Sequence, residues 1–436
     1  DPELDAAHSA QRDAHTPDYE HVFSDERVHD IHIQITPDVR RHMLDNMTAL
    51  FGPRGQEHEH ERRLPERGAV IDEYAPTPDY FPVTVHEDGR SWRQVAMRYK
   101  GNSTLSTSWE HDTLKISFRL HFDRFEDQHP EITGQRFHGF QELVFASGFM
   151  DRALLRDKLA ADLLRAQGAP AAQAAYYRVF VDAGEGPEYW GLYLLLEEPS
   201  DTLISSQFAA GTGTLYKPDG PGADFTHFDP TGFPKKTRKQ SGDFSDVERA
   251  ITALHAPREQ PERWRSQLEA AFDVGGFLKM LATSRALLHW DCYGFLAHNY
   301  FVYGDPSHDG RLSWISWDHN NVLLLHEELP KLSVMMDEVD TSWPLIRYLL
   351  DDPQYRAAYR AELASLLTGP FAKQRFDRRV TQLHQLIAPH VIGPDGEHAP
   401  YTHLSDPQQL EAAVADLIAA ADARRAELVQ VLLPSP

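Results

Sequence analysis

Cysteine, long apolar runs and positive charge are all scarce in this sequence. Only one of its 436 residues is a cysteine, Cys292, so the chain cannot form an internal disulfide. No apolar run reaches the roughly 18 residues that a membrane-spanning helix requires, and we therefore expect no membrane span. The formal net charge of −23 argues against nucleic-acid binding, because phosphate backbones select basic surfaces. A simpler reason for the acidity is solubility.

The sequence also lacks several common catalytic motifs. It contains no HExxH, no GxSxG and no paired CxxC, and its Gly-rich segment 211–217 is neither a P-loop nor a complete GxGxxG. The charged tract 56–67 contains His58-Glu-His-Glu61, which could bind a metal ion, but it lacks the ligand spacing of a zinc helix. A solvated loop is the simpler interpretation of that tract.

The expected elements are β-rich first and helix-rich second. Alternating residues and turn signals predict strands at 28–35, 114–122, 176–181 and 190–196, and hairpins at 80–100 and 299–317. Helical periodicity and capping residues predict helices at 37–50, 151–167, 244–254, 261–272 and 274–289, and mostly helix from about 344 onward. In the helix 151–167, Asp151 is the expected N-cap and Gly168 the expected C-terminal stop. This order favours a two-lobed α+β enzyme over alternating βαβ units.

We expect four regions along the chain. Residues 1–27 are a polar lead-in, loose over its first 25 residues, and residues 28–200 are a β-rich N-lobe. Residues 201–343 are a C-lobe with the catalytic loop and a metal-site hairpin, and residues 344–436 are a helical C-terminal extension. The first residues, Asp1-Pro2, include no initiator Met, which is expected of a processed mature form or a trimmed chain.

The densest group of polar residues lies around the predicted hairpin 299–317. Asn299 opens its first strand, and Asp318 directly follows its second. In an antiparallel hairpin the start of one strand lies beside the end of the other. Asn299 and Asp318 should therefore be neighbours, with Asp291 in the loop just before them.

One carboxamide and two carboxylates would then converge on one place. Such oxygen ligands suit Mg²⁺ or Mn²⁺ bound together with substrate phosphates. The same chain order occurs in protein-kinase sites, where a base Asp precedes a metal-binding Asn, a hairpin and a metal-binding Asp. Each residue alone is better explained by capping or by bonding to the backbone. Their order together favours a functional site.

Phosphate contacts are expected from segments that lie upstream. The turn Lys100-Gly101-Asn102-Ser103, which is expected to join two strands, exposes backbone N–H groups that can cradle phosphate, although most such turns are only turns. Lys115, on the next predicted strand, is either an inward lysine that holds phosphate oxygens or a surface lysine that extends to solvent. Lys217 ends the Gly-rich segment 211–217.

A series of short collinear motifs runs along most of the chain, roughly over residues 28–430. They are KGNST at 100–104, LKISF at 114–118, LLRDKLA at 154–160, YWGLYLLLE at 189–197, LYK at 215–217, Trp290-Asp291, HNY at 298–300, Trp317-Asp318 and the terminal helix with Arg424-Arg425. Each motif alone is unspecific. Together they resemble the spore coat protein H (CotH) kinase-like family.

The resemblance implies an atypical protein-kinase-like fold that transfers the γ-phosphate of ATP with Mg²⁺ or Mn²⁺. It implies that Asp291 is the catalytic base, that Asp318 is the metal aspartate and that Asn299 is the second metal ligand. Lys115 resembles the phosphate-binding lysine. Glu197 falls on a recurrent glutamate of the family, whose role is not assigned.

The chain departs from the family and kinase patterns in several places, one of which is the absence of a complete kinase Gly-rich loop. The phosphate turn begins Lys100-Gly where the family suggests Arg-Gly, which keeps the charge but loses a bidentate fork. Asp291 and Asn299 are eight residues apart (299 − 291), whereas about five is usual in kinases. The helix 151–167 presents basic residues instead of an obvious inward Glu that would pair with the lysine.

We therefore expect an ATP- and divalent-metal-dependent phosphotransferase whose partner is a protein with a Ser/Thr acceptor hydroxyl. One alternative is a non-catalytic surface, adhesion or scaffold protein on the same fold. Another is an ATP-using transferase that acts on a non-protein acceptor. Family members are associated with spore coats and host-cell adhesion, which favours an extracytoplasmic or secreted location, with a cytoplasmic location as the alternative.

Overall fold

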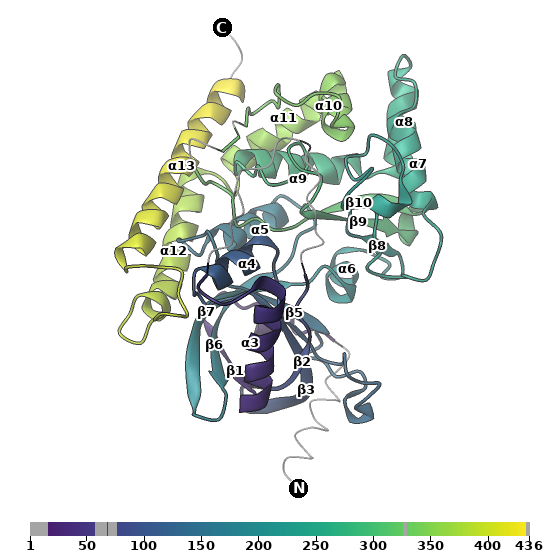
Figure 1. The fold of residues 1–436 in the computed structure, drawn as a ribbon. Helices are drawn as coiled ribbons and strands as arrows, with labels where there is room; N and C mark the ends of the chain where they lie inside the picture. Colours follow the sequence, from purple (N-terminus) through teal and green to yellow (C-terminus); the bar gives the residue numbers. More distant parts are fainter. Residues whose placement is uncertain (1–15, 57–67, 69–75, 326–328, 331, 433–436) are drawn as a thin grey trace.

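The computed structural model describes residues 16–56, 68, 76–325, 329–330 and 332–432, and their elements form a mixed α+β fold. The tract 57–67, interpreted above as a solvated loop, lies outside these residues. Figure 1 shows a β-barrel at one end of the molecule and a mostly helical half at the other. Within the described ranges, no helix combines the length and the apolarity that crossing a bilayer requires.

Strands β1 to β7 close into a barrel in the order β1-β2-β3-β4-β5-β7-β6. Strands β1 and β6 pair in parallel and close it, while the other neighbours are antiparallel. Burial alternates along β1 because successive side chains of a strand point to opposite faces. The strands are β1 His29–Gln34, β2 Phe81–Glu87, β3 Arg90–Tyr99, β4 Phe118–His121, β5 Glu142–Ala146, β6 Ala174–Asp182 and β7 Pro187–Glu197.

The segment that precedes the barrel is packed against it. The short helix α2, Tyr19–Val22, buries Val22 completely in the barrel core. The hydroxyl of Tyr177 on β6 donates to the carbonyl of Val22 at 2.9 Å. The described part of the expected loose lead-in is therefore packed rather than loose, because its apolar side chains complete the core.

Two helices lie beside the barrel strands. Helix α3, Pro37–Phe51, begins where Thr36 accepts a hydrogen bond from the backbone N–H of Val39 at 3.1 Å. Helix α4, Ser103–Glu110, follows β3, so the phosphate turn joins a strand to a helix and not two strands as expected. The strand predicted at 114–122 is reduced to β4, because the backbone N–H of Leu114 pairs with Pro400 instead of a barrel strand.

The other half of the molecule is mainly helical (Figure 1). It holds a three-stranded sheet in the order β10-β9-β8. Its elements are α5 Arg156–Ala166, α6 Asp201–Gln207, β8 Thr214–Tyr216, α7 Ser245–Leu254, α8 Pro261–Ala271, α9 Val274–Ala286, β9 Tyr300–Asp305, β10 Arg311–Ser316, α10 Pro344–Asp351, α11 Pro353–Thr368, α12 Lys373–Val391 and α13 Gln408–Leu432, with short 3₁₀ turns at 130–132, 230–232 and 306–308.

Helix α5 begins later than the sequence suggests. Asp151, predicted as its N-cap, accepts hydrogen bonds from the backbone N–H groups of Ala153 at 3.1 Å and Arg156 at 2.7 Å. It therefore shapes the turn before the helix, which starts at Arg156. The predicted stop at Gly168 is confirmed by its left-handed backbone, with φ of +77°.

Candidate functional site

The candidate site is built around the end of the β9–β10 hairpin. The backbone N–H of Trp317 donates to the carbonyl of Asn299 at 3.1 Å, so Asn299 and Asp318 lie at the same end of the hairpin, as predicted. Both have left-handed backbones, with φ of +59° and +60°. Asn and Asp tolerate this region better than other residues with side chains, and such outliers concentrate at functional sites.

Asp291 lies in the loop that leads into β9 and is held by three neighbours. His298 Nε2 lies 2.5 Å from Asp291 Oδ1, and Asn321 Nδ2 donates to Asp291 Oδ2 at 3.3 Å. Asn299 Nδ2 donates to the backbone carbonyl of Asp291 at 3.0 Å. These contacts bring Asp291 and Asn299 together and orient a carboxylate that is 18% exposed.

Asp318 is surrounded by charges of both signs. Burial raises the pKa of its carboxyl to about 6, and the carboxylates of Asp157 and Asp291 add to that increase. Lys100 and His319 act in the opposite direction on this pKa. Three carboxylates in one partly buried place repel one another when ionised, and a bound cation relieves that repulsion.

Asp157 is a site residue that the sequence reasoning missed. It lies in the first turn of α5, and its Oδ1 accepts a hydrogen bond from the backbone N–H of His319 at 2.7 Å. The His319 ring in turn contacts Ser316 Oγ at 2.8 Å. The available signal was the motif 154–160, in which an acidic residue stands between two basic ones.

Basic side chains lie beside the carboxylates. Burial lowers the pKa of Lys100, and Arg119 and Lys217 lower it further, while Glu198 and Asp318 oppose them. Glu198 forms an ion pair with Arg119, whose Nη2 lies 2.7 Å from Glu198 Oε1. The predicted residues Lys100 and Lys217 are thus in one electrostatic neighbourhood, and like charges held near each other favour an anion such as phosphate.

The turn that holds Lys100 leads directly into helix α4. Gly101 adopts φ of +132°, and a Cβ atom there would lie 2.6 Å from Thr104 Oγ1, so the turn requires glycine. The first N–H groups of a helix have no partners within it, and the helix dipole favours anions at this end. Gly101, Asn102 and Ser103 therefore present a backbone suited to phosphate beside the Lys100 side chain.

Two predicted nucleotide-binding residues have other partners. Lys115 is 1% exposed and forms an ion pair with Glu397, so it is not a surface lysine. Glu197 is fully buried and accepts hydrogen bonds from the Tyr19 hydroxyl at 2.5 Å and from the backbone N–H of Gln173 at 3.1 Å. The contacts of these two residues are thus internal to the protein. A role for Lys115 or Glu197 in nucleotide binding stays a prediction.

The residues at the hairpin end are of the kinds that bind a divalent cation. The side-chain nitrogen of Asn299 donates to the backbone carbonyl of Asp291, so the carboxamide oxygen is the atom that can bind a cation. Asn321 Oδ1 is buried and has no hydrogen-bond partner in the part of the chain that the structure describes. A buried acceptor without a partner costs free energy, and a cation held by nearby oxygens offsets this cost.

Comparisons with known proteins agree with the resemblance of the short motifs. The family described as CotH kinase protein matches residues 97–428, more than half of the chain. Inner spore coat protein H of Bacillus subtilis is 22% identical over 265 residues, which cover 59% of this chain and 70% of that protein. Invasin CotH2 of Rhizopus delemar is 22% identical over 259 residues, which cover 55% of this chain and 43% of the invasin. The chain belongs to the CotH kinase protein family.

Proposed function

We propose that this protein is a phosphotransferase that moves the γ-phosphate of ATP, with Mg²⁺ or Mn²⁺, to the hydroxyl of a protein Ser or Thr. The observation that carries the proposal is the charge around Asp318, with Asp157 and Asp291 on one side and Lys100 on the other. Phosphoryl transfer needs both kinds of group, oxygen ligands for the cation and fixed positive charge for the phosphates. Membership in a family described as kinase supports the same reaction.

The residues divide into two groups by chemistry. Asp318 and Asn299 would hold the cation, which when bound neutralises charge on the phosphates. Lys100 and Lys217 would contact phosphate oxygens, together with the backbone of the Gly101–Ser103 turn. Positioning and charge neutralisation then supply the catalysis, since phosphoryl transfer requires little covalent chemistry from the protein itself.

Asp291 is suited to orient the acceptor hydroxyl and accept its proton. His298 and Asn321 each contact one of its carboxylate oxygens and hold the group in place. A positioned carboxylate contributes mainly in the transition state, because the hydroxyl becomes acidic only as it attacks.

A two-lobed kinase-like arrangement accommodates these roles. The Lys100 turn belongs to the barrel, whereas Asp291, Asn299 and Asp318 belong to the mostly helical half (Figure 1). A nucleotide bound by both groups would lie where the two halves meet. An extracytoplasmic or secreted location stays a prediction.

The proposal is tested by calorimetric titration of the wild-type chain with ATP, with and without Mg²⁺ or Mn²⁺. Intact-mass analysis after incubation with ATP and metal gives a second readout, in which gain of one phosphate indicates transfer to the chain itself. Phosphate transfer is also measured on generic protein and small-molecule acceptors. Metal-dependent ATP binding with transfer supports the proposal, whereas neither binding nor transfer with any divalent metal contradicts it.

The name of the second relative favours one other function. Invasin CotH2 is named as an invasin, which is compatible with a non-catalytic surface, adhesion or scaffold role on the same fold as the second candidate. A protein with that role alone would show no mass change in the ATP experiment. Transfer to a small molecule but not to protein would instead indicate a non-protein acceptor, and gain of one nucleotide would indicate nucleotide transfer.

A further inference from the structure

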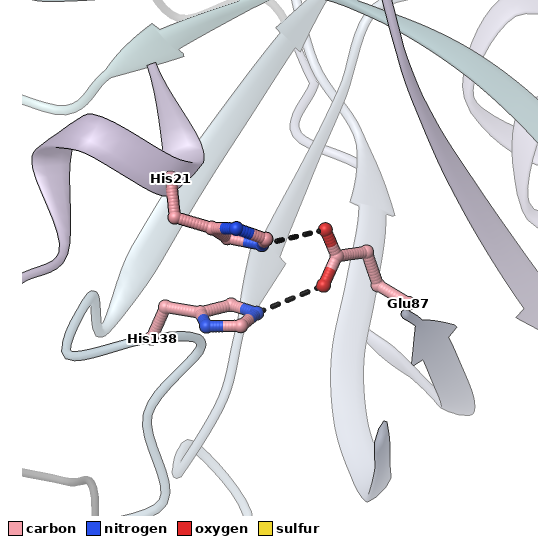
Figure 2. A group of neighbouring side chains, drawn as sticks. All are labelled: His21, Glu87 and His138. Atoms are coloured by element: carbon pink, nitrogen blue, oxygen red, sulfur yellow. Dashed lines mark hydrogen bonds and ion pairs between the residues drawn. The ribbon is translucent and has the colours of Figure 1, made fainter. Parts of the chain in front are cut away.

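A second group of ligand-type side chains lies on the barrel, outside the hairpin-end site. His21 comes from α2, Glu87 ends β2, and His138 lies in the loop before β5 (Figure 2). His21 Nε2 is 2.9 Å from Glu87 Oε1, and His138 Nε2 is 2.9 Å from Glu87 Oε2. One ligand atom from each residue lies within 4.8 Å of the other two. The three residues form a compact N,N,O donor set.

The donor set is largely buried. The side chain of Glu87 is 1% exposed and that of His138 is 6% exposed, so the carboxylate is removed from water. A buried carboxylate is costly unless a positive charge compensates it. The two imidazole rings that face it have centroids 4.3 Å apart, so one ion can contact both rings and the carboxylate. A divalent cation satisfies both nitrogen lone pairs and the carboxylate at once.

We propose that His21, Glu87 and His138 bind Zn²⁺. Zinc takes imidazole nitrogen at about 2.0–2.1 Å and carboxylate oxygen at about 2.0–2.2 Å. In a tetrahedral site these bond lengths place the ligand atoms about 3.3–3.5 Å apart. The two nitrogen–oxygen separations of 2.9 Å, one to each oxygen of Glu87, are shorter than this by a fraction of an ångström, and all three ligand atoms lie within 4.8 Å of one another. Magnesium prefers an all-oxygen site, so the two imidazoles distinguish this site from the hairpin end.

The site has a route for the ion and a place for a fourth ligand. The His21 side chain is 24% exposed, so it forms the solvent-facing side of the group. Water would take the fourth position. Asp88 Oδ2 lies 3.9 Å from His21 Nε2, but Asp88 also contacts Arg27 at 3.2 Å.

A bound zinc ion would join three segments that are distant in sequence. It would fasten α2 to β2 and to the loop of His138, where the backbone N–H of Asp18 already donates to the His138 carbonyl at 2.9 Å. The ion is therefore structural, and its expected effect is to hold the N-terminal segment on the barrel.

The test uses the whole chain, stripped with EDTA and titrated with ZnCl₂ by calorimetry in excess Mg²⁺. Metal content after dialysis and the melting temperature with and without zinc are measured in parallel. We expect one zinc per chain and a higher melting temperature with zinc. His21→Gln can keep the hydrogen bond to Glu87 but loses the imidazole ligand. It should weaken zinc binding at least about 100-fold, since even outer-shell changes cost about 10- to 100-fold.

Two matched variants control for zinc bound elsewhere. His29→Gln alters a buried histidine whose ring is 6.0 Å from that of His21, and it should bind zinc like the wild type. The double variant His58→Ala/His60→Ala should also bind like the wild type. His138→Gln should match His21→Gln, and if it does not fold by circular dichroism, the more exposed His21 position decides. Equal zinc affinity in His21→Gln and wild type, loss of zinc in the His58/His60 variant, or no zinc uptake at all would overturn the proposal.

Discussion

Two lysines of this molecule lie near carboxylates but in opposite circumstances. Lys115 forms a direct ion pair with Glu397, and both side chains are 1% exposed. Lys100 is only half-buried, and its charged neighbourhood contains Arg119 as well as Asp318. The first arrangement is neutral and closed to solvent. The second gathers several cations and carboxylates and is within reach of solvent.

The difference teaches which lysine is available to a ligand. A buried pair whose charges cancel contributes to the fold, and a phosphate that approached Lys115 would meet a lysine already engaged by Glu397. A lysine and a carboxyl group whose pKa values are both perturbed are typical of a binding or catalytic site. We infer that Lys100 contacts phosphate, while a phosphate contact of Lys115 stays a prediction.

The strongest way to test this contrast is to neutralise Asp318, the carboxylate beside Lys100. Asp318→Asn should lose metal-dependent ATP binding and also transfer, because cation and phosphates bind as a unit. Several kcal/mol of transition-state stabilisation would be lost, which is roughly a thousandfold or more in rate. Calorimetry with ATP and Mg²⁺ is paired with the transfer assay. Unchanged ATP affinity in this variant would contradict Asp318 as the metal ligand.

Asp291→Asn should separate catalysis from binding within the same site. We expect ATP–metal affinity close to that of the wild type, because Asp291 is assigned to the acceptor and not to the phosphates. The rate should fall by about two to four orders of magnitude, the range for removal of a general base. Single-turnover rates at saturating ATP give the comparison. If Asp291→Asn abolishes ATP binding while Asp318→Asn keeps it, the two roles are reversed.

Replacing each lysine by Met should give opposite results. Lys115→Met leaves Glu397 buried without its counter-charge and should lower the free energy of unfolding by about 3–5 kcal/mol. Lys100→Met removes a charge that burial and Arg119 already disfavour, so stability should hold while ATP affinity falls about tenfold or more. Urea denaturation and ATP titration are measured on both variants.

The double variant Lys115→Met/Glu397→Gln controls the lysine comparison. Glu397 also accepts a hydrogen bond from the backbone N–H of Leu192 at 2.8 Å, which Gln can preserve through its carbonyl oxygen. Removing both charges should recover much of the lost stability, because no uncompensated ion remains. Our contrast fails if Lys115→Met is stable but does not bind ATP while Lys100→Met binds normally.

Local patterns in the sequence predicted the hairpin end well. The alternation of the two strands and the residues that flank them place Asn299 and Asp318 side by side, as the structure confirms. Helix α9 and the terminal helix α13 were likewise predicted, because each is defined by residues within a few turns. Such features depend on neighbours along the chain, which a single sequence displays.

Contacts between distant segments could not be read in the same way. Lys115 and Glu397 are 282 residues apart, and alternation alone left Lys115 either inward or exposed. Asp157 joins the site only because α5 packs where its first turn meets His319. His21 was assigned to a loose lead-in, since nothing in its local sequence shows that it contacts Glu87 of the barrel. Tertiary packing decides these contacts.

The smallest expected effect is the pH dependence that Asp318 gives to folding. Burial and the neighbouring carboxylates raise its pKa from an ordinary 3.8 to about 6. Between these values the folded chain binds more protons at this group than the unfolded chain does. The free energy of unfolding should therefore fall as pH rises from about 4 to 6, by at most about 3 kcal/mol from this group.

Other groups titrate in the same window, so the measurement is a difference between wild type and Asp318→Asn. The buried imidazole of His289, for example, has a pKa held well below its usual value by burial, and its protonation on acidification opposes folding. The Asn variant should match wild type near pH 4 and exceed it in stability near pH 7.5, since it lacks the ionised carboxylate.

Adding Mg²⁺ and ATP at pH 7.5 should stabilise the wild type but not the variant. The affinity of the wild type for Mg²⁺–ATP should weaken about tenfold for each pH unit below 6, because a proton competes with the cation for Asp318. Urea denaturation from pH 4 to 7.5 checks the first expectation, and ATP titration from pH 5 to 7.5 checks the second. A stability difference that does not change with pH would show that the Asp318 carboxylate is compensated within the fold, like Lys115, and that the hairpin end has no need of a cation.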